Sequence, residues 1–337
     1  MQLTDFNYTL PPERIAQTPI EPRDAARLLV LDRRTGSTSH RFVRDLPDLL
    51  EPGDLVIANR SRVLPARVFG TLRGGGRAEL LLLRRLSAGR WEALCRPARR
   101  LRVGDQVYIT EALSVTVEAA RPEGVRELAV RAAENDRADA ALLAAGTTPL
   151  PPYIRGWTGD PERYQTVFAD AEGSAAAPTA GLHLTRELLA RLEQRGIAFS
   201  TVVLHVGLDT FRPVTEADPR QHAIHREWYS VPPETIARVT ETRESGGRVV
   251  AIGTTVVRTL ETYAQTGQPE GWSDLFILPG HQFALIDVLM TNFHLPQSSL
   301  LMLVSAFAGR ARILAAYQEA IQLQYRFYSF GDAMLLL

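Results

Sequence analysis

Between residues 66 and 132 the sequence breaks into short segments in which apolar and polar residues often alternate. Turn sequences such as Gly74-Gly75-Gly76 and Gly104-Asp105 separate them. The segments are 66–72, 78–84, 91–96, 106–109, 113–119 and 127–132. Short strands at a spacing of about ten residues predict a small antiparallel β-barrel or a sandwich. We place this domain at residues 66–147, between Pro65 and the proline-rich run 149–152.

The sequence on either side of this region alternates between strand-like and helix-like patterns. Thr185 is positioned to cap a helix, and Gly196 follows its end. Helices are predicted at 186–195, 233–244 and 299–308, with another that follows the turn Gly253-Thr254-Thr255 and runs to about residue 265. Strands are predicted at 27–31, 55–58, 197–204, 248–252, 275–278 and 284–289. This order predicts an α/β main domain with a mixed, partly parallel sheet covered by helices. The main domain would comprise residues 1–65 and 148–337, with the barrel inserted into it.

The 337-residue chain has a single cysteine, Cys95, which cannot form an internal disulfide or a cysteine-based zinc cluster. Its first residues lack the basic and apolar regions of a signal peptide. No segment approaches the ~20 apolar residues of a membrane helix. We therefore expect a cytoplasmic protein that contacts no membrane, and no obligate protein partner is evident.

All 38 basic residues are arginine, which excludes Schiff-base chemistry on lysine and the phosphate-binding lysine of P-loop proteins. The net charge is zero, but residues 60–102 contain twelve arginines and only two acidic residues. This asymmetry indicates a polyanionic partner for the region. A solvated surface that uses arginine heavily is the alternative explanation.

Small residues dominate the segment 177–183, which ends at His183 shortly before the helix 186–195. Small side chains allow a ligand to approach the backbone closely. A histidine with an ordinary pKa of ~6.5 is suited to proton transfer near neutral pH. The alternative is a helix-capping loop with a packed histidine.

Polar groups also follow two predicted strands, at the end where open α/β sheets bind ligands. His205-Val206-Gly207 follows strand 197–204, and Gly253-Thr254-Thr255 follows strand 248–252. The second turn offers amides and hydroxyls to a carboxylate or phosphate, and Arg258, predicted in the first helical turn, could add a bidentate contact. The turn lacks the spacing of a dinucleotide-binding fingerprint.

Two further groups contain histidine. His222, His225 and Glu227 carry metal-ligating atoms, but their spacing does not place all three on one helix face, so acid–base chemistry or substrate contact is a second interpretation. Asn292 and His294 lie between two apolar segments. Burial without partners would cost ~1–3 kcal/mol for each, so we expect both to bind backbone or ligand.

Together and in this order, the motifs resemble those of the S-adenosylmethionine:tRNA ribosyltransferase-isomerase family of queuosine biosynthesis. The resemblance covers nearly the whole chain. It rests on Thr4-Asp5-Phe6, Arg62-Val63-Leu64-Pro65-Ala66-Arg67, Pro149–Ile154, Tyr164–Phe168, Ala176–His183, His205-Val206-Gly207, Thr210-Phe211, Gly253-Thr254-Thr255, Thr291–Pro296, Leu303–Gly309, Tyr325-Arg326-Phe327 and Gly331–Met334.

This resemblance implies transfer and isomerisation of the ribosyl part of S-adenosylmethionine onto 7-aminomethyl-7-deazaguanine at the wobble position of tRNA. The products would be epoxyqueuosine-tRNA, adenine and methionine. No metal or redox cofactor is implied, since S-adenosylmethionine is consumed as a substrate. The expected partners are therefore S-adenosylmethionine and a tRNA that bears the aminomethyl-deazaguanine base.

The implied reaction requires several proton transfers, because the sulfonium acidifies neighbouring hydrogens and adenine leaves poorly without a donor. We assign the proton transfers to a group made up of His183, His225, Glu227 and His294. The methionine carboxylate is assigned to Gly253, Thr254, Thr255 and Arg258, and the tRNA backbone to Asn59, Arg62 and the basic insert. Further substrate-binding candidates are Thr179, Gly181, His205, Gly207, Thr210, Phe211 and Asn292.

Arg60-Ser61, Asp209 and His281 depart from the pattern of the family, which has a small polar residue then threonine, a glycine and an aromatic residue there. Two other classes of function remain open. One is a non-catalytic RNA-binding module that uses the basic barrel. The other is a metal-dependent hydrolase built on His222, His225 and Glu227.

Overall fold

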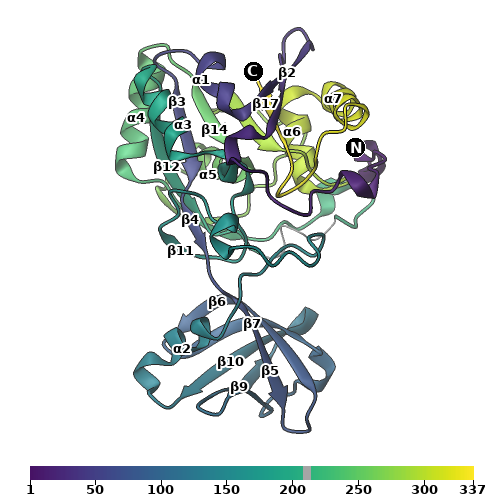
Figure 1. Cartoon of the computed structure of the whole chain (residues 1–337), viewed down its shortest axis with the longest axis vertical. Coiled ribbons are helices and arrows are strands. Elements are labelled where there is room, and N and C mark those ends of the chain that lie inside the picture. The colour runs from purple at the N-terminus through teal and green to yellow at the C-terminus, as the bar shows by residue number, and fades with distance from the viewer. Residues whose placement is uncertain (208–213) are drawn as a thin grey trace. The chain divides into compact units, whose positions relative to one another are not determined.

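The computed structural model describes residues 1–207 and 214–337. The chain divides into two compact units (Figure 1). The first comprises Met1–Arg62, Pro152–Ala171 and Ala177–Leu337, and the second comprises Val63–Pro151 and Glu172–Ala176. The first unit is thus assembled from sequence on both sides of the second. Strands β4 (Ser61–Val63) and β11 (Ala171–Ser174) pair as a two-stranded ribbon.

A nine-stranded sheet forms the centre of the first unit, in the order β15-β13-β12-β3-β14-β16-β17-β1-β2. The strands are β1 (Arg27–Leu31), β2 (Thr38–Phe42), β3 (Leu55–Asn59), β12 (Ala198–Leu204), β13 (Glu227–Ser230), β14 (Val249–Ile252), β15 (Glu270–Ser273), β16 (Val288–Asn292) and β17 (Ala333–Leu336). The four central strands β12, β3, β14 and β16 run parallel. All residues of β3, β14 and β16 are buried, as expected for strands covered on both faces.

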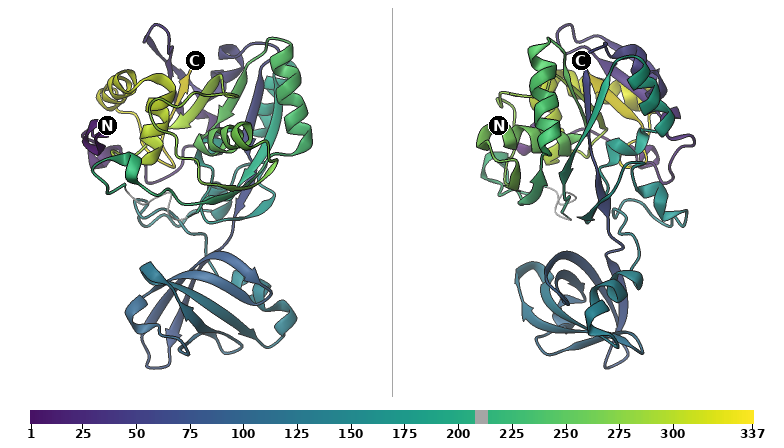
Figure 2. Two further views of the ribbon diagram at one scale, coloured as in Figure 1. Left: turned by 180° about the vertical axis from the view of Figure 1, so that it is seen from behind. Right: turned by 90° about the vertical axis from the view of Figure 1, so that its left-hand side faces the viewer.

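Helices cover both faces of this sheet (Figure 2). They are α1 (Leu46–Leu49), α3 (Arg186–Gln194), α4 (Pro233–Glu244), α5 (Thr254–Thr266), α6 (Ser299–Ala308) and α7 (Arg310–Gln322). Val56, Val250 and Met290 pack on one face in a core cluster with residues of α1 and α3. Because side chains alternate along a strand, α4 and α5, which contact the same strands, cover the opposite face.

The second unit is a closed antiparallel barrel in the order β10-β7-β6-β5-β8-β9. Its strands are β5 (Arg67–Leu72), β6 (Arg77–Ser87), β7 (Arg90–Arg96), β8 (Gln106–Thr110), β9 (Leu113–Ala120) and β10 (Val125–Ala132). Alternate residues such as Val68, Leu80 and Val115 fill the interior. Helix α2 (Ala138–Ala144) is held to the barrel through Asp139, which accepts a hydrogen bond of 2.6 Å from the Trp91 indole.

The predicted fold class is therefore confirmed: an α/β domain with a mixed, partly parallel sheet, and an inserted antiparallel β-barrel. All six predicted barrel strands are present. The helix 299–308 has the predicted bounds, and the Thr185 hydroxyl accepts from the amide of Leu188 to cap α3.

Two strand predictions fail in the first unit. Residues 275–278 are not a strand, because the sheet edge is formed by β15, which ends at Ser273. The strand predicted at 284–289 begins only at Val288. Before it, the amides of Ala284 and Leu285 donate to the buried carboxylate of Glu261, at 2.8 and 3.0 Å, instead of to a neighbouring strand.

Among residues 1–207 and 214–337, no single helix combines the length and apolar character needed to cross a membrane. Helices α6 and α7 meet that test only as a pair, and they are bent by 113° at their junction.

Candidate functional site

The predicted motifs meet at one edge of the main sheet. The parallel strands β3, β12, β14 and β16 end there at Asn59, Leu204, Ile252 and Asn292. The His205-Val206-Gly207 and Gly253-Thr254-Thr255 segments continue directly from two of these ends. The carboxyl edge of a parallel sheet, where loops diverge, is the usual position of a ligand site in an α/β fold.

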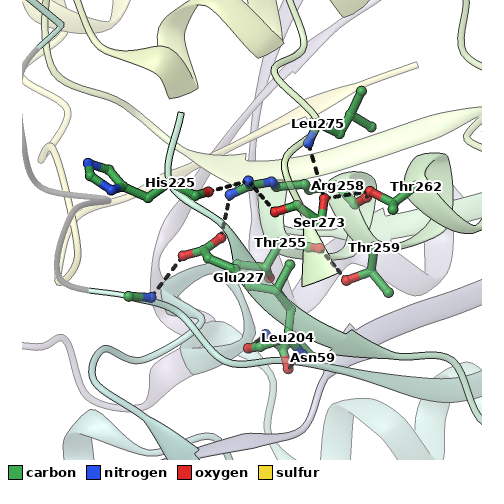
Figure 3. A network of polar contacts seen from close by, with 11 residues as sticks. Asn59, Leu204, His225, Glu227, Thr255, Arg258, Thr259, Thr262, Ser273 and Leu275 are labelled. Atoms are coloured by element: carbon green, nitrogen blue, oxygen red, sulfur yellow. Dashed lines mark hydrogen bonds and ion pairs between the residues drawn. The ribbon is translucent and has the colours of Figure 1, made fainter. Parts of the chain in front are cut away.

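A buried ion pair joins two of the predicted site residues. A guanidinium nitrogen of Arg258 lies 2.6 Å from Oε2 of Glu227, and their side chains are only 12% and 8% exposed. Arg258 also donates to the backbone oxygens of His225, at 2.7 Å, and Ser273, at 2.9 Å (Figure 3). Burial lowers the pKa of Arg258, and the Glu227 charge opposes that effect. Arg258 therefore ties α5 to β13 and to the end of β15.

The other carboxylate oxygen of Glu227 accepts the amide of Gly207 at 2.8 Å. Glu227 therefore holds both Arg258 and the segment that follows β12. Arg258 is the fifth residue of α5, so its predicted position in the first turn is wrong. Its guanidinium is directed at β13 and β15, and it contributes to the site by holding these strands in place.

Glu227 and Arg258 line a pocket with a polar end and an apolar wall. About 690 Å³ of space, which includes open solvent, lies between its lining residues. Its polar lining comprises His222, His225, Glu227, Thr254, Thr255, Arg258 and Ser299. The apolar wall comprises Ile224, Leu275, Phe276, Ile277, Leu300 and Leu303. In Figure 3 the imidazole of His225 points away from the Arg258 guanidinium.

The amino terminus of α5 opens into this pocket. Gly253 precedes the helix with φ of +96°, a left-handed conformation that favours glycine. The first amides of a helix have no intrahelical acceptor, so they are available to an anion. The hydroxyl oxygen of Thr255 is buried and has no hydrogen-bond partner among the described residues. Thr254, Thr255 and the preceding glycine therefore form a site with donors for a carboxylate or phosphate.

The segment that ends at His183 forms a second polar group. Residues Thr179–His183 form a short 3-10 helix. Its Thr179 hydroxyl donates to Oδ1 of Asn292 at 3.1 Å, and the Asn292 amide lies 3.2 Å from Nε2 of His183. Burial lowers the pKa of His183 to about 4, so the imidazole is neutral at physiological pH.

This second group lies beside α5. A Cβ on Gly253 would lie 3.3 Å from the Cβ of Ala180. A Cβ on Gly181 would lie 2.9 Å from the Thr166 methyl group, so the small residues of this segment serve close packing. His183 lines a smaller hollow together with Arg23, Arg163 and Ser329. It does not line the larger pocket.

His294 is buried and hydrogen-bonded within the protein. Its Nε2 lies 3.0 Å from the Thr291 hydroxyl, and its amide donates to the Tyr317 hydroxyl at 2.9 Å. Burial lowers the pKa of His294 to about 3. His294 lines neither hollow. The four predicted proton-transfer residues are thus distributed over three environments, and among the pockets lined by described residues only one contains two of them, His225 and Glu227.

Asn59 and Arg62, predicted to contact the tRNA backbone, both bind within the protein. Asn59 is 1% exposed; its amide donates to the oxygen of Leu204 at 2.9 Å, and its Oδ1 accepts from the amides of Leu204 and Ser61. It joins the ends of β3 and β12. The Arg62 guanidinium forms an ion pair with Glu162. Contact of Asn59 with a phosphate is excluded in this conformation, because its polar atoms are buried and bonded.

The remaining predicted residues have mixed positions. The His205 ring stacks on Trp228 with a centroid separation of 5.2 Å, and burial lowers its pKa. His222 Nδ1 lies 2.7 Å from a carboxylate oxygen of Glu216. No group of three or more metal-ligating side chains converges among the described residues. Thr210 and Phe211, and the departure at Asp209, lie outside the described residues.

Sequence reasoning missed the apolar half of the pocket. Leu275, Phe276 and Ile277 were interpreted as a strand because they form an apolar run. The run instead follows β15, where Oγ of Ser273 accepts the amide of Leu275 at 3.3 Å, and its side chains line the pocket.

His281, another departure from the family pattern, packs edge-on against Phe283 and lies 3.4 Å from Glu261.

An α/β sheet with a polar pocket at its carboxyl edge, and an inserted antiparallel barrel, place this protein among two-domain α/β proteins. Residues 3–336 match the family described as "Queuosine biosynthesis protein". The chain belongs to this family, whose named members are enzymes, and the resemblance seen in the sequence is confirmed.

Two similar proteins carry the same name. The chain is 52% identical to the S-adenosylmethionine:tRNA ribosyltransferase-isomerase of Symbiobacterium thermophilum and 51% identical to that of Moorella thermoacetica, with the full length of both chains covered in each comparison. A crystal structure of the S-adenosylmethionine tRNA ribosyltransferase from Thermotoga maritima is similar with a TM-score of 0.58 and 42% identity. It covers 99% of this chain and 100% of its own.

Proposed function

We propose that the protein transfers and isomerises the ribosyl part of S-adenosylmethionine onto 7-aminomethyl-7-deazaguanine at the wobble position of tRNA. The products are epoxyqueuosine-tRNA, adenine and methionine. The observation that carries the proposal is the family match from residue 3 to residue 336, which includes every element of the pocket. S-adenosylmethionine acts as a substrate, and no metal or redox cofactor takes part. The reaction takes place in the cytoplasm.

The pocket at the sheet edge is the proposed site for S-adenosylmethionine. Its amino-terminal helix amides and the Thr254 and Thr255 hydroxyls suit the methionine carboxylate, because anions bind at helix amino termini. The apolar wall of Leu275, Phe276 and Ile277 suits the less polar parts of the same molecule. Arg258 supports this site through Glu227.

Proton transfer is assigned to the group His183, His225, Glu227 and His294. His225 and Glu227 line the pocket, whereas His183 and His294 are neutral donors or acceptors in buried surroundings. A neutral imidazole can accept a proton as a base or donate a hydrogen bond from its protonated nitrogen.

One reaction tests the proposal. The protein is mixed, without added metal, with S-adenosylmethionine and a tRNA that carries the aminomethyl-deazaguanine base, and free adenine is measured by chromatography. Adenine that appears only with this tRNA supports the transferase. Bound tRNA without adenine would favour a binding module, and activity that a chelator abolishes would favour a metal-dependent hydrolase.

Alanine in place of His183 or His294 is expected to lower turnover by orders of magnitude and to leave tRNA affinity unchanged. Near-normal turnover would remove that residue from the proton-transfer group. Binding of tRNA should also weaken steeply with salt, because each phosphate contact releases counterions. A flat salt response would contradict the role of the basic insert.

A further inference from the structure

The basic stretch 60–102 contains arginines of two kinds. Six of its twelve arginines form ion pairs, for example Arg67 with Glu79 and Arg85 with Asp139. For the other six, no ion pair occurs among the side chains that the structure describes. These six are Arg73, Arg77, Arg96, Arg99, Arg100 and Arg102. All belong to the barrel unit, so the positive charge left without a carboxylate is concentrated there.

One outer face of the barrel combines this charge with exposed aromatic rings. Arg77 of β6, Thr71 of β5 and Tyr108 of β8 form a row across three neighbouring strands, since Thr71 pairs with both of the others. Phe69 precedes Thr71 by two residues and therefore lies on the same face. Phe69 and Tyr108 are 37% and 43% exposed, and the Arg77 guanidinium lies 4.4 Å from the Phe69 ring centroid.

A hollow adjoins the aromatic rings. It is lined by Arg73 from the β5–β6 turn, Arg100 and Gln106, among others. Oε1 of Gln106 accepts the Tyr108 hydroxyl at 2.9 Å, so the ring and the hollow are contiguous. Asp105 also lines the hollow, where its carboxylate accepts the amide of Arg102 at 2.7 Å.

We propose that this face, composed of Phe69, Thr71, Arg77 and Tyr108 with the adjoining Arg73–Arg100 hollow, binds unpaired nucleotides of the substrate tRNA. The aromatic rings stack on splayed bases, and the arginines contact the flanking phosphates. The inference rests on the proposed function, because it takes tRNA as the substrate, and it adds the place and mode of recognition outside the pocket.

The chemistry of the face favours single-stranded RNA over other polyanions. Every base has a π-face, and stacking on exposed aromatic side chains is the usual mode of binding to unpaired nucleotides. A guanidinium over an aromatic ring extends the stacking platform. A purely electrostatic surface for duplex phosphates would not require exposed phenylalanine and tyrosine. The one carboxylate in the adjacent row, that of Glu79, is bound by Arg67 at 3.1 Å.

Binding of two RNAs by four variants of the full chain tests the inference. The RNAs are the substrate tRNA and a fully paired RNA duplex, which presents phosphates but no unpaired base. Tyr108→Ser removes the ring, and Tyr108→Phe keeps it without the hydroxyl. Arg77→Gln removes a charge from the face. Arg131→Gln removes an exposed charge from β10, which lies three strands from β5 in either direction around the barrel and so serves as a matched control.

We expect Tyr108→Ser to weaken tRNA binding roughly 5- to 150-fold, the equivalent of one lost base stack, and to leave duplex binding unchanged. Tyr108→Phe should bind both RNAs as the wild type does. Arg77→Gln should weaken binding to tRNA and lower the slope of log affinity against log salt by about 0.7–1, whereas Arg131→Gln should not.

Wild-type affinity of Tyr108→Ser for tRNA would overturn the inference, and so would equal losses on tRNA and duplex. If Tyr108→Ser unfolds at the same temperature as the wild type, its loss of tRNA affinity does not come from a folding defect. Tyr108→Phe provides the same check if the serine variant unfolds early, because loss of binding in a folded Tyr108→Phe would also contradict stacking. Failure of the proposed function is separate, since it appears as absence of adenine release from the wild-type protein.

Discussion

Replacement of Arg258 by methionine removes the charge that faces Glu227 in the pocket wall. The two groups lie 2.6 Å apart and are nearly buried, and the variant also removes the donors to the oxygens of His225 and Ser273. Breaking a buried ion pair by removal of one partner costs about 3–5 kcal/mol. We expect this loss in the free energy of unfolding, measured by urea denaturation with an unchanged m-value.

Arg220 provides the control. It also lies 2.6 Å from a carboxylate, that of Asp218, but its side chain is 63% exposed. Exposed pairs contribute little, so Arg220→Met should leave the urea midpoint almost unchanged. The double variant Arg258→Met/Glu227→Gln should be less destabilised than the sum of its single variants, because it leaves no buried charge without its partner. Equal midpoints for Arg258→Met and Arg220→Met would refute the reasoning.

Three other substitutions or conditions have defined outcomes. The folded pKa of His294, about 3, lies below its ordinary 6.5. The neutral His294 stabilises the folded protein fully above pH 6.5, and this contribution is lost as the pH falls toward 3. The free energy of unfolding of the wild type should therefore fall with decreasing pH up to ~1.4 kcal/mol per pH unit more steeply than that of His294→Gln, as measured by urea denaturation at each pH. Gly253→Ala places a Cβ on a residue with φ of +96°, 3.3 Å from the Cβ of Ala180. We expect the free energy of unfolding to fall by ~1–3 kcal/mol and the KM for S-adenosylmethionine to rise. An unchanged melting temperature would show that the turn tolerates alanine. Asn59→Ala leaves the buried oxygen of Leu204 and the amide of Ser61 without their side-chain partner. Urea denaturation should show a free energy of unfolding lower by ~1–3 kcal/mol for each group left unpaired, and a total loss below ~0.5 kcal/mol would contradict these hydrogen bonds.

Much of the fold could be predicted because its signals are local. The alternation in residues 66–132 depends only on neighbouring residues, and all six strands formed as expected. Thr185 caps α3 through an amide three residues away. The carboxyl-edge rule then placed the segments after Leu204 and Ile252 at one edge of the sheet, where the pocket lies.

The roles of side chains in the pocket depended on contacts between distant segments. Arg258 was expected to meet a ligand, yet its partner is Glu227, 31 residues earlier in the chain. The apolar run 275–278 has the composition of a strand, but among the described residues it pairs with no strand of the sheet. Its residues Leu275, Phe276 and Ile277 line the pocket instead.

The sequence by itself thus determined most of the elements, the inserted barrel and the family, since these depend on periodicity, capping residues and motifs read along the chain. Only the tertiary structure decided which polar groups are bonded within the protein and which face a pocket. The physical reason is that a buried guanidinium or amide must find partners wherever packing brings them. The sequence assigned His183, His225 and His294 to one proton-transfer group, whereas burial and neighbours from other segments give them three different environments.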